Sequence, residues 1–82
     1  MNDRTMVFSL SKEDKDAEMK KNLSNVYNAL AQKGYDPISQ IAGYVLSEDP
    51  TYITTHNNAR KLVRKIDRDE LLKAMIRSYL SN

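Results

Sequence analysis

Apolar side chains recur along this 82-residue chain at helical spacing, and no segment shows the strict alternation that is typical of a half-buried β-strand. The first stripe follows the order i, i+4, i+7, i+8, i+11 and consists of Met19, Leu23, Val26, Tyr27 and Leu30. Gly34 is well placed to end this helix, because a helix C-terminus commonly needs a left-handed residue, which glycine adopts at little cost. The pattern therefore predicts a helix that ends just before Gly34.

The segment "YDPISQIAGYVLSEDP" carries the clearest helix boundary signals in the chain. Asp36 can accept hydrogen bonds from the first free amides, and Pro37 suits the first helical position, where no N–H donor is needed. The stripe predicted for this helix is Ile38, Ile41, Ala42, Val45 and Leu46. Asp49 and Pro50 repeat the same pair, so we expect "SEDP" to end the helix and to start a short turn through Ile53.

Two more apolar stripes follow, and they are out of phase with each other. The first consists of Ala59, Leu62, Val63 and Ile66, and the second of Leu71, Leu72, Met75, Ile76, Tyr79 and Leu80. At about 100° per residue the second stripe is rotated by roughly a third of a turn, so one straight helix cannot bury both against one surface. Asp67 and Glu70 have the spacing of a capping box, and we place a helix boundary there.

These elements predict one all-α domain of four main helices and a short turn. Residues 1–16, which include the charged run "SKEDKD", are expected to form a flexible N-terminal tail, and residues 17–82 the helical domain. A chain of this length buries a limited core and is often marginal alone, so a homodimer is a possibility from length alone. The tyrosines, Tyr44 among them, are expected to pack in the core or in a dimer contact.

Composition narrows the possible chemistry. The chain has no cysteine and one histidine, which excludes disulfides, thiolate catalysis and a His/Cys zinc cluster. No catalytic motif connects His56 to a nucleophile, and two glycines cannot form a phosphate-cradling loop, so we expect neither an enzyme nor a cofactor. No apolar run approaches the roughly 20 residues that cross a bilayer, and the N-terminus lacks a signal peptide core; we expect a cytoplasmic protein.

Positive charge is concentrated in the C-terminal part of the chain. Residues 1–49 carry six Lys/Arg against eight Asp/Glu, a balance of −2, whereas residues 50–82 carry seven against three, a balance of +4. Arg60, Arg64 and Arg68 lie four residues apart there, with Arg68 in the first turn of the last helix if the chain breaks at Asp67. Such a row can be a solvated helix face, an anion-binding site or a nucleic-acid-reading ridge.

The sequence "KGYDPISQIAGYVLSEDPTYITTHNNARKLVRKIDRDELLKAMIRSYL" resembles the IreB/ReoM family of small regulatory phosphoproteins from Gram-positive bacteria. The resemblance follows the pattern KGYNPxxQIxGYLLSGDPxYIxxHxxARxxIRxxxRDE over about Lys33–Leu80, with few gaps. It implies an all-helical homodimer whose N-terminal tail is phosphorylated on a threonine. The implied kinase is a membrane-anchored Ser/Thr kinase, opposed by a cognate phosphatase.

The same resemblance implies control of peptidoglycan synthesis and of antibiotic tolerance, in some members through regulated proteolysis of a precursor-synthesis enzyme. The phosphorylated residue corresponds to Thr5, and the partner- or phosphate-binding positions correspond to His56, Arg60, Arg64 and Arg68. This sequence departs from the pattern with "SEDP" in place of "SGDP", and with threonines at positions 54 and 55 where members often have proline and arginine.

Two functional hypotheses remain at this point. In the first, phosphorylated Thr5 docks onto the arginine row, or competes for it, since a phosphate adds about −1.5 to −2 charges and three strong acceptors. In the second, "HNNARKLVRKI" is the recognition helix of a helix-turn-helix-like nucleic-acid-binding domain. The low net charge of +2 and the acidic residues that interrupt the row favour the first.

Overall fold

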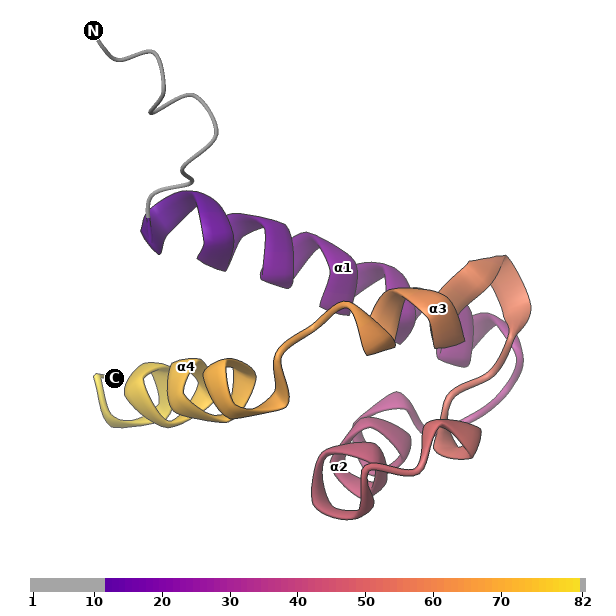
Figure 1. Cartoon of the computed structure of the whole chain (residues 1–82). Coiled ribbons are helices and arrows are strands. Elements are labelled where there is room, and N and C mark those ends of the chain that lie inside the picture. The colour runs from indigo at the N-terminus through magenta and orange to yellow at the C-terminus, as the bar shows by residue number, and fades with distance from the viewer. Residues whose placement is uncertain (1–11, 82) are drawn as a thin grey trace, which may run out of the picture.

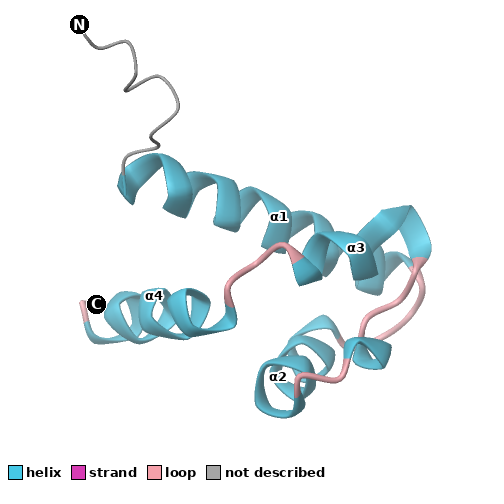
Figure 2. Cartoon of the chain, in the orientation of Figure 1, coloured by secondary structure: helices cyan, strands magenta, loops and turns pink. Residues whose placement is uncertain are grey.

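A computed structural model describes residues 12–81, and every regular element in that range is helical (Figures 1 and 2). The elements are α1 (Lys12–Gln32), α2 (Pro37–Ser47), the 3-10 turns η2 (Pro50–Tyr52) and η3 (His56–Asn58), α3 (Ala59–Arg64) and α4 (Arg68–Leu80). The prediction of an all-α fold with four main helices is therefore confirmed. The connections are short, so successive helices lie close to one another along the chain.

The first helix is longer than its apolar stripe predicts. It begins at Lys12, so residues 12–16, which we assigned to the tail, are helical. Lysine and glutamate are good helix formers, and Glu13 and Asp14 place negative charge in the first turn, where it interacts favourably with the helix dipole. Residues 1–11 and 82 lie outside the described part of the chain.

The other end of α1 closes as the sequence predicts. Gly34 has a φ of 84°, in the left-handed region. Its N–H donates to the carbonyl of Ala31, and the N–H of Tyr35 donates to the carbonyl of Leu30, each over 3.0 Å. This pair of bonds is a Schellman motif, which satisfies two of the free carbonyls at the helix end and turns the chain toward α2.

The predicted cap of α2 is present. Asp36 accepts hydrogen bonds from the amides of Ile38 (3.1 Å) and Ser39 (3.4 Å), with Pro37 at the first helical position. The Ser39 hydroxyl also donates to the Asp36 carboxylate at 2.9 Å. These hydrogen bonds, the one from the Ser39 side chain first, lower the pKa of Asp36, because they stabilise its ionised form.

The end of α2 and the start of η2 share one short stretch of sequence. Glu48 lies in the left-handed region with a φ of 62° and its N–H donates to the carbonyl of Tyr44 at 2.8 Å. Asp49 then caps η2 by accepting from the amide and the hydroxyl of Thr51 at 3.0 and 2.7 Å. The Thr51 side chain is the main reason that the pKa of Asp49 is lowered. The predicted helix end and turn are thus confirmed.

The core lies between α1, α2 and α3. It consists of Val26, Ala29, Leu30, Ile41, Tyr44, Ile53, Ala59, Val63, Ile66 and Leu71. Leu30, Ile53, Val26 and Val63 are its largest fully buried side chains. Figure 1 shows α3 lying along the C-terminal half of α1, and these two helices form the closest packed pair in the described chain. The stripe predicted for α3 is therefore the one that faces the core.

The buried face of α2 differs from its predicted stripe. Ile41 and Tyr44 are buried, whereas Ile38 and Leu46 are 66% and 87% exposed. At about 100° per residue, this places the buried face to one side of the stripe, toward Tyr44. Ile41 and Tyr44 both belong to the core cluster that α2 shares with α1 and α3, so packing against these helices sets which face of α2 is buried.

The last helix begins where the phase change predicts. Asp67 caps α4 by accepting from the amides of Asp69 and Glu70 at 2.9 and 3.2 Å. Leu71 is buried, but the rest of the predicted stripe is exposed: Leu72 46%, Met75 39%, Ile76 50%, Tyr79 84% and Leu80 76%. Beyond its first turn, α4 makes few close approaches to the other described elements.

Candidate functional site: a cationic hollow on α3

A hollow of about 270 Å³ lies beside α3 and is lined by Thr55, Asn58, Arg60, Lys61 and Arg64. Arg60 and Arg64 are four residues apart in the sequence, so both project from the same face of this helix. Within the described part of the chain, no acidic side chain lines the hollow. It therefore offers three cationic groups beside one hydroxyl and one amide, which are the groups that recognise phosphate or carboxylate.

The backbone that leads into α3 has an uncommon shape. Asn57 and Asn58 have φ values of 52° and 61°, two consecutive left-handed residues. Asparagine tolerates this conformation better than most residues, but each such residue still carries a conformational cost. Asn57 Nδ2 donates to Gln32 Oε1 of α1 at 3.2 Å, and this bond fixes the turn on α1. The turn brings Asn58 to the rim of the hollow.

Arg60 has a structural role as well as a place in the hollow. Its Nε donates to the carbonyl of Ile53 at 2.8 Å, and the residue is half-buried. This bond holds the segment after η2 against α3, and Ile53 itself is fully buried. Guanidinium has five N–H donors and this bond uses one, so Arg60 keeps donors for a ligand. It is fixed in place before any ligand arrives.

Arg64 and Lys61 are the cations of the hollow that lack a partner among residues 12–81. Both side chains are exposed, and among residues 12–81 neither takes part in a hydrogen bond or an ion pair. Solvated cations close to each other on one helix repel weakly, and a bound anion would remove that repulsion. Arg64 is thus the predicted site residue whose side chain is most available to a partner.

Arg68 lies apart from the hollow, so the structure does not bring it together with Arg60 and Arg64; it occupies the first turn of α4, as the predicted break at Asp67 implies. Its Nη1 donates to the carbonyl of Val45 at 2.7 Å, and its Nη2 forms an ion pair with Glu48. Asp67, Asp69 and Glu70 lie close to it in sequence, but within residues 12–81 no ion pair joins any of them to Arg68. Its charge is balanced instead at the C-terminal end of α2, where carbonyl groups and a carboxylate favour a cation.

His56 is also held by α1. Its Nε2 is 2.8 Å from Gln32 Oε1, the same oxygen that accepts from Asn57. Its backbone N–H donates to the Thr54 hydroxyl at 3.2 Å. His56 does not line the hollow, so its described contacts are those of a residue that orients the turn before α3. The predicted phosphorylation site, Thr5, lies outside the described residues.

Three members of this site were not predicted from the sequence. Lys61, Thr55 and Asn58 line the hollow together with the two arginines. Lys61 could have been added because it is adjacent to Arg60 on an exposed face. No local signal pointed to Gln32, because it is 24 residues from His56 and meets it through the tertiary fold.

The described residues hold neither of two other kinds of site. Between positions 12 and 81, no three His, Cys, Asp or Glu side chains are grouped in a way that could hold a metal ion. In the same range, no helix has both the length and the apolar character that are required to cross a bilayer. The hollow on α3 is the one that gathers the two arginines Arg60 and Arg64 that the sequence predicted.

The fold and the hollow describe a small helical domain with a cationic surface on α3. The sequence agrees with a family model over nearly its whole length: the model of the IreB regulatory phosphoproteins matches residues 3–81. The chain therefore belongs to the IreB regulatory phosphoprotein family. This result confirms the resemblance noted from the sequence and extends it from the helical part to the beginning of the chain.

Proposed function

We propose that this protein is a non-enzymatic cytoplasmic regulator, phosphorylated on Thr5 by a membrane Ser/Thr kinase and dephosphorylated by a cognate phosphatase. It would control peptidoglycan synthesis and antibiotic tolerance by binding a protein of a proteolysis pathway. Membership of a regulatory phosphoprotein family supports this proposal. Thr5 lies within the matched range 3–81, ahead of the first helix, where a kinase could bind it in an extended form.

The cationic hollow is the observation that carries the proposed mode of action. Arg64 and Lys61 have no partner among residues 12–81, and Arg60 is already oriented by its bond to Ile53. A phosphothreonine, or an acidic side chain of a partner, would supply the missing negative charge through charge-assisted hydrogen bonds. Phosphorylated Thr5 would thus compete with a protein partner for the same surface, in the same or a second subunit.

The proposed regulator is a homodimer that uses the outer face of α4. The exposed residues of that face are Leu72, Met75, Ile76, Tyr79 and Leu80, spaced as one side of a helix. Monomeric proteins seldom leave a continuous apolar stripe in water, and such a stripe usually marks an interaction site. Sedimentation of the wild type and of Ile76→Asp tests this part, since a charge at the centre of the stripe should shift the dimer to monomer.

No observation in residues 12–81 specifically favours the nucleic-acid-binding alternative. Its proposed recognition helix, α3, has six residues, about 9 Å of helix, which is short for reading a major groove. Arg60 and Arg68 each donate a hydrogen bond to a backbone carbonyl, which leaves fewer arginine N–H groups to contact bases. A duplex titration at two salt concentrations would show a steep salt dependence if this alternative were correct.

The proposed partner surface is tested by affinity capture from a lysate, with bound proteins identified by mass spectrometry. Unmodified and Thr5-phosphorylated protein are compared, each as wild type, Arg64→Ala and Arg77→Ala. The last variant is the matched control, an exposed arginine on α4 outside the hollow. We expect a phosphorylation-sensitive partner whose capture is lost in Arg64→Ala and kept in Arg77→Ala. Equal capture by all three proteins would show that the hollow is not the contact surface.

A further inference from the structure

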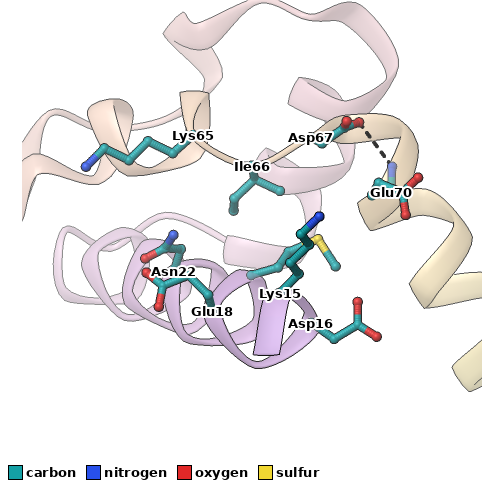
Figure 3. A pocket seen from close by; sticks show the side chains of 9 residues that line it. Lys15, Asp16, Glu18, Asn22, Lys65, Ile66, Asp67 and Glu70 are labelled. Atoms are coloured by element: carbon teal, nitrogen blue, oxygen red, sulfur yellow. Dashed lines mark hydrogen bonds between the residues drawn. The ribbon is translucent and has the colours of Figure 1, made fainter. Parts of the chain in front are cut away.

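A second hollow, of about 530 Å³, lies between α1 and the connection from α3 to α4 (Figure 3). It is lined by Lys15, Asp16, Glu18, Met19, Asn22, Lys65, Ile66, Asp67 and Glu70. Figure 3 shows the Ile66 side chain directed from the connection toward α1, with Asp67 and Glu70 on the opposite wall from Asp16 and Glu18. The volume is within the range of about 300–1,000 Å³ that is typical of ligand sites.

This hollow has a small apolar floor and an acidic rim. Met19 and Ile66 are its apolar residues, and Met19 is partly exposed although it packs against the core. Four carboxylates and two lysines line it, so the rim carries a net charge of −2. An occupant that fits must therefore bring a few apolar side chains and avoid strong negative charge.

The N-terminal residues of the same chain have this chemistry. The sequence RTMVFSL, residues 4–10, combines four apolar side chains with one arginine, and it carries no acidic residue. The described chain begins at Lys12, and the lining of the hollow begins three residues later at Lys15. From Lys12 to Asn22 α1 rises about 15 Å. Residues 4–10 in extended form span about 23 Å, which is enough to return along the whole hollow.

We propose that residues 4–10 of the unmodified chain dock into this hollow, with their apolar side chains on Met19 and Ile66 and with Arg4 among the rim carboxylates. A short segment suits the site better than a second copy does. A stable dimer buries about 800 Å² per partner, and a floor of two apolar residues contributes little of that area. Tethering also favours the segment, since its effective concentration at the adjacent hollow is high.

Phosphorylation of Thr5 releases the segment, a consequence that rests on the proposed function above. The phosphate adds about −1.5 to −2 charges to a segment that lies against a rim of net charge −2. Like charges in a partly closed hollow repel more strongly than in open water, because the local dielectric constant is lower. Modification at one threonine thereby changes the position of the N-terminal residues, and a released phosphothreonine becomes available to the cationic hollow on α3.

The docking is tested on the full-length chain by paramagnetic relaxation. The chain has no cysteine, so Asp3→Cys gives a single position for a nitroxide label just outside the docked residues. We expect strong loss of amide signal at Met19–Asn22 and at Ile66–Glu70, and unchanged signals around Ile38 on α2. Replacing Val7 and Phe8 by serine in the labelled chain should restore the lost signals, because the apolar contacts are gone.

Two results would overturn the docking. In the first, the labelled wild type and the Val7/Phe8 serine variant show the same signal loss, as expected for an undocked segment. In the second, the loss appears in a mixture of isotope-labelled chains without nitroxide and nitroxide-labelled chains without isotope, which would assign the hollow to a second copy. Both measurements use unmodified protein, so they do not depend on the proposed kinase.

The release is tested separately with the Thr5-phosphorylated chain. We expect phosphorylation to restore the signals of Met19–Asn22 in the wild type. In Glu18→Lys the rim loses its net negative charge, so the phosphorylated segment should remain docked. Glu13→Lys is the matched control, an acidic residue of the same helix that does not line the hollow, and should behave as the wild type. A phosphorylated wild type that still shows the full signal loss would overturn the release while leaving the docking intact.

Discussion

The helices α3 and α4 carry similar apolar stripes and have opposite surroundings. Ala59 and Val63 of α3 are fully buried, and Ile66 just after it is 6% exposed. On α4, Tyr79 and Leu80 are 84% and 76% exposed. The difference follows from packing: α3 lies along the C-terminal half of α1, whereas α4 makes few close approaches to the other described elements beyond its first turn. An apolar stripe thus predicts which side of a helix packs against another element. Whether that element belongs to the same chain depends on the tertiary fold.

The largest expected difference between the two regions is in stability. Leu30→Ala removes a fully buried side chain between α1 and α3, and we expect a loss of about 2–5 kcal/mol in the free energy of unfolding. Leu80→Ala is the matched change on α4, where an exposed leucine contributes within about 0.5 kcal/mol to a monomer. Urea denaturation measures the free energy of unfolding of both variants, at a protein concentration too low for the chain to dimerise. A similar loss in the two variants would show that the α4 stripe is covered within the subunit.

The sequence predicts the helix boundaries better than it predicts the contacts. Asp36, Gly34 and Asp67 act within a few residues of their own position, so their roles follow from local rules and the structure confirms them. The rotation of α2 toward Tyr44 depends on what packs against it, and periodicity alone does not contain that information.

At the candidate site, too, the sequence predicts local geometry but not contacts between distant residues. Arg60 and Arg64 share a face because of their spacing, and the structure brings them together in one hollow as helical geometry predicts. Arg68 was separated from them by the break at Asp67, but its partners on α2, the Val45 carbonyl and Glu48, are 23 and 20 residues away in sequence. Contacts between residues this far apart in sequence depend on the tertiary structure, and no motif in a single sequence predicts them.

A second test concerns α2, which is packed more tightly than α4. A Cβ added to Gly43 would lie 2.5 Å from Cε1 of the Tyr52 ring. We expect Gly43→Ala to destabilise the protein by about 1–3 kcal/mol through this clash, less the helix propensity of about 1 kcal/mol that alanine gains. In a Tyr52→Ala background the clash is absent, so the same substitution should become stabilising. Thermal unfolding of the four proteins of this cycle checks the change of sign.

A third test addresses how α4 is held. Arg68 joins the start of α4 to the end of α2 through one carbonyl and one carboxylate, and its side chain is 30% exposed. Because solvent screens such a contact, we expect Arg68→Ala to cost about 1 kcal/mol. Amide hydrogen exchange should rise several-fold in α4 and stay unchanged in α1 and α3. Equal acceleration in all three helices would mean that α4 opens together with the core.

A smaller effect is expected from pH at the caps of α2 and η2. Hydrogen bonds lower the pKa of Asp36 and of Asp49 below the value of 3.8 that each would otherwise have. A lowered pKa in the folded state means that these carboxylates stabilise the fold above about pH 4, and that this contribution is lost as pH falls through the lowered values. Asp36→Asn keeps a capping side chain that does not titrate, so the variant should lose less stability than the wild type between pH 5 and pH 3 by urea unfolding.

The smallest net effect is expected at Glu48, where two contributions oppose each other. Glu48 occupies a left-handed position that costs a non-glycine residue about 1 kcal/mol, and the family pattern places glycine there. Its carboxylate also forms the ion pair with Arg68, an exposed pair whose contribution is up to about 1 kcal/mol at low salt. Glu48→Gly should therefore leave stability nearly unchanged at low salt and raise it at about 1 M salt, where screening removes the ion pair from the wild type. If Glu48→Gly destabilised the protein at both salt concentrations, the side-chain contacts of Glu48 that hold α4 to α2 would contribute more than the left-handed backbone costs.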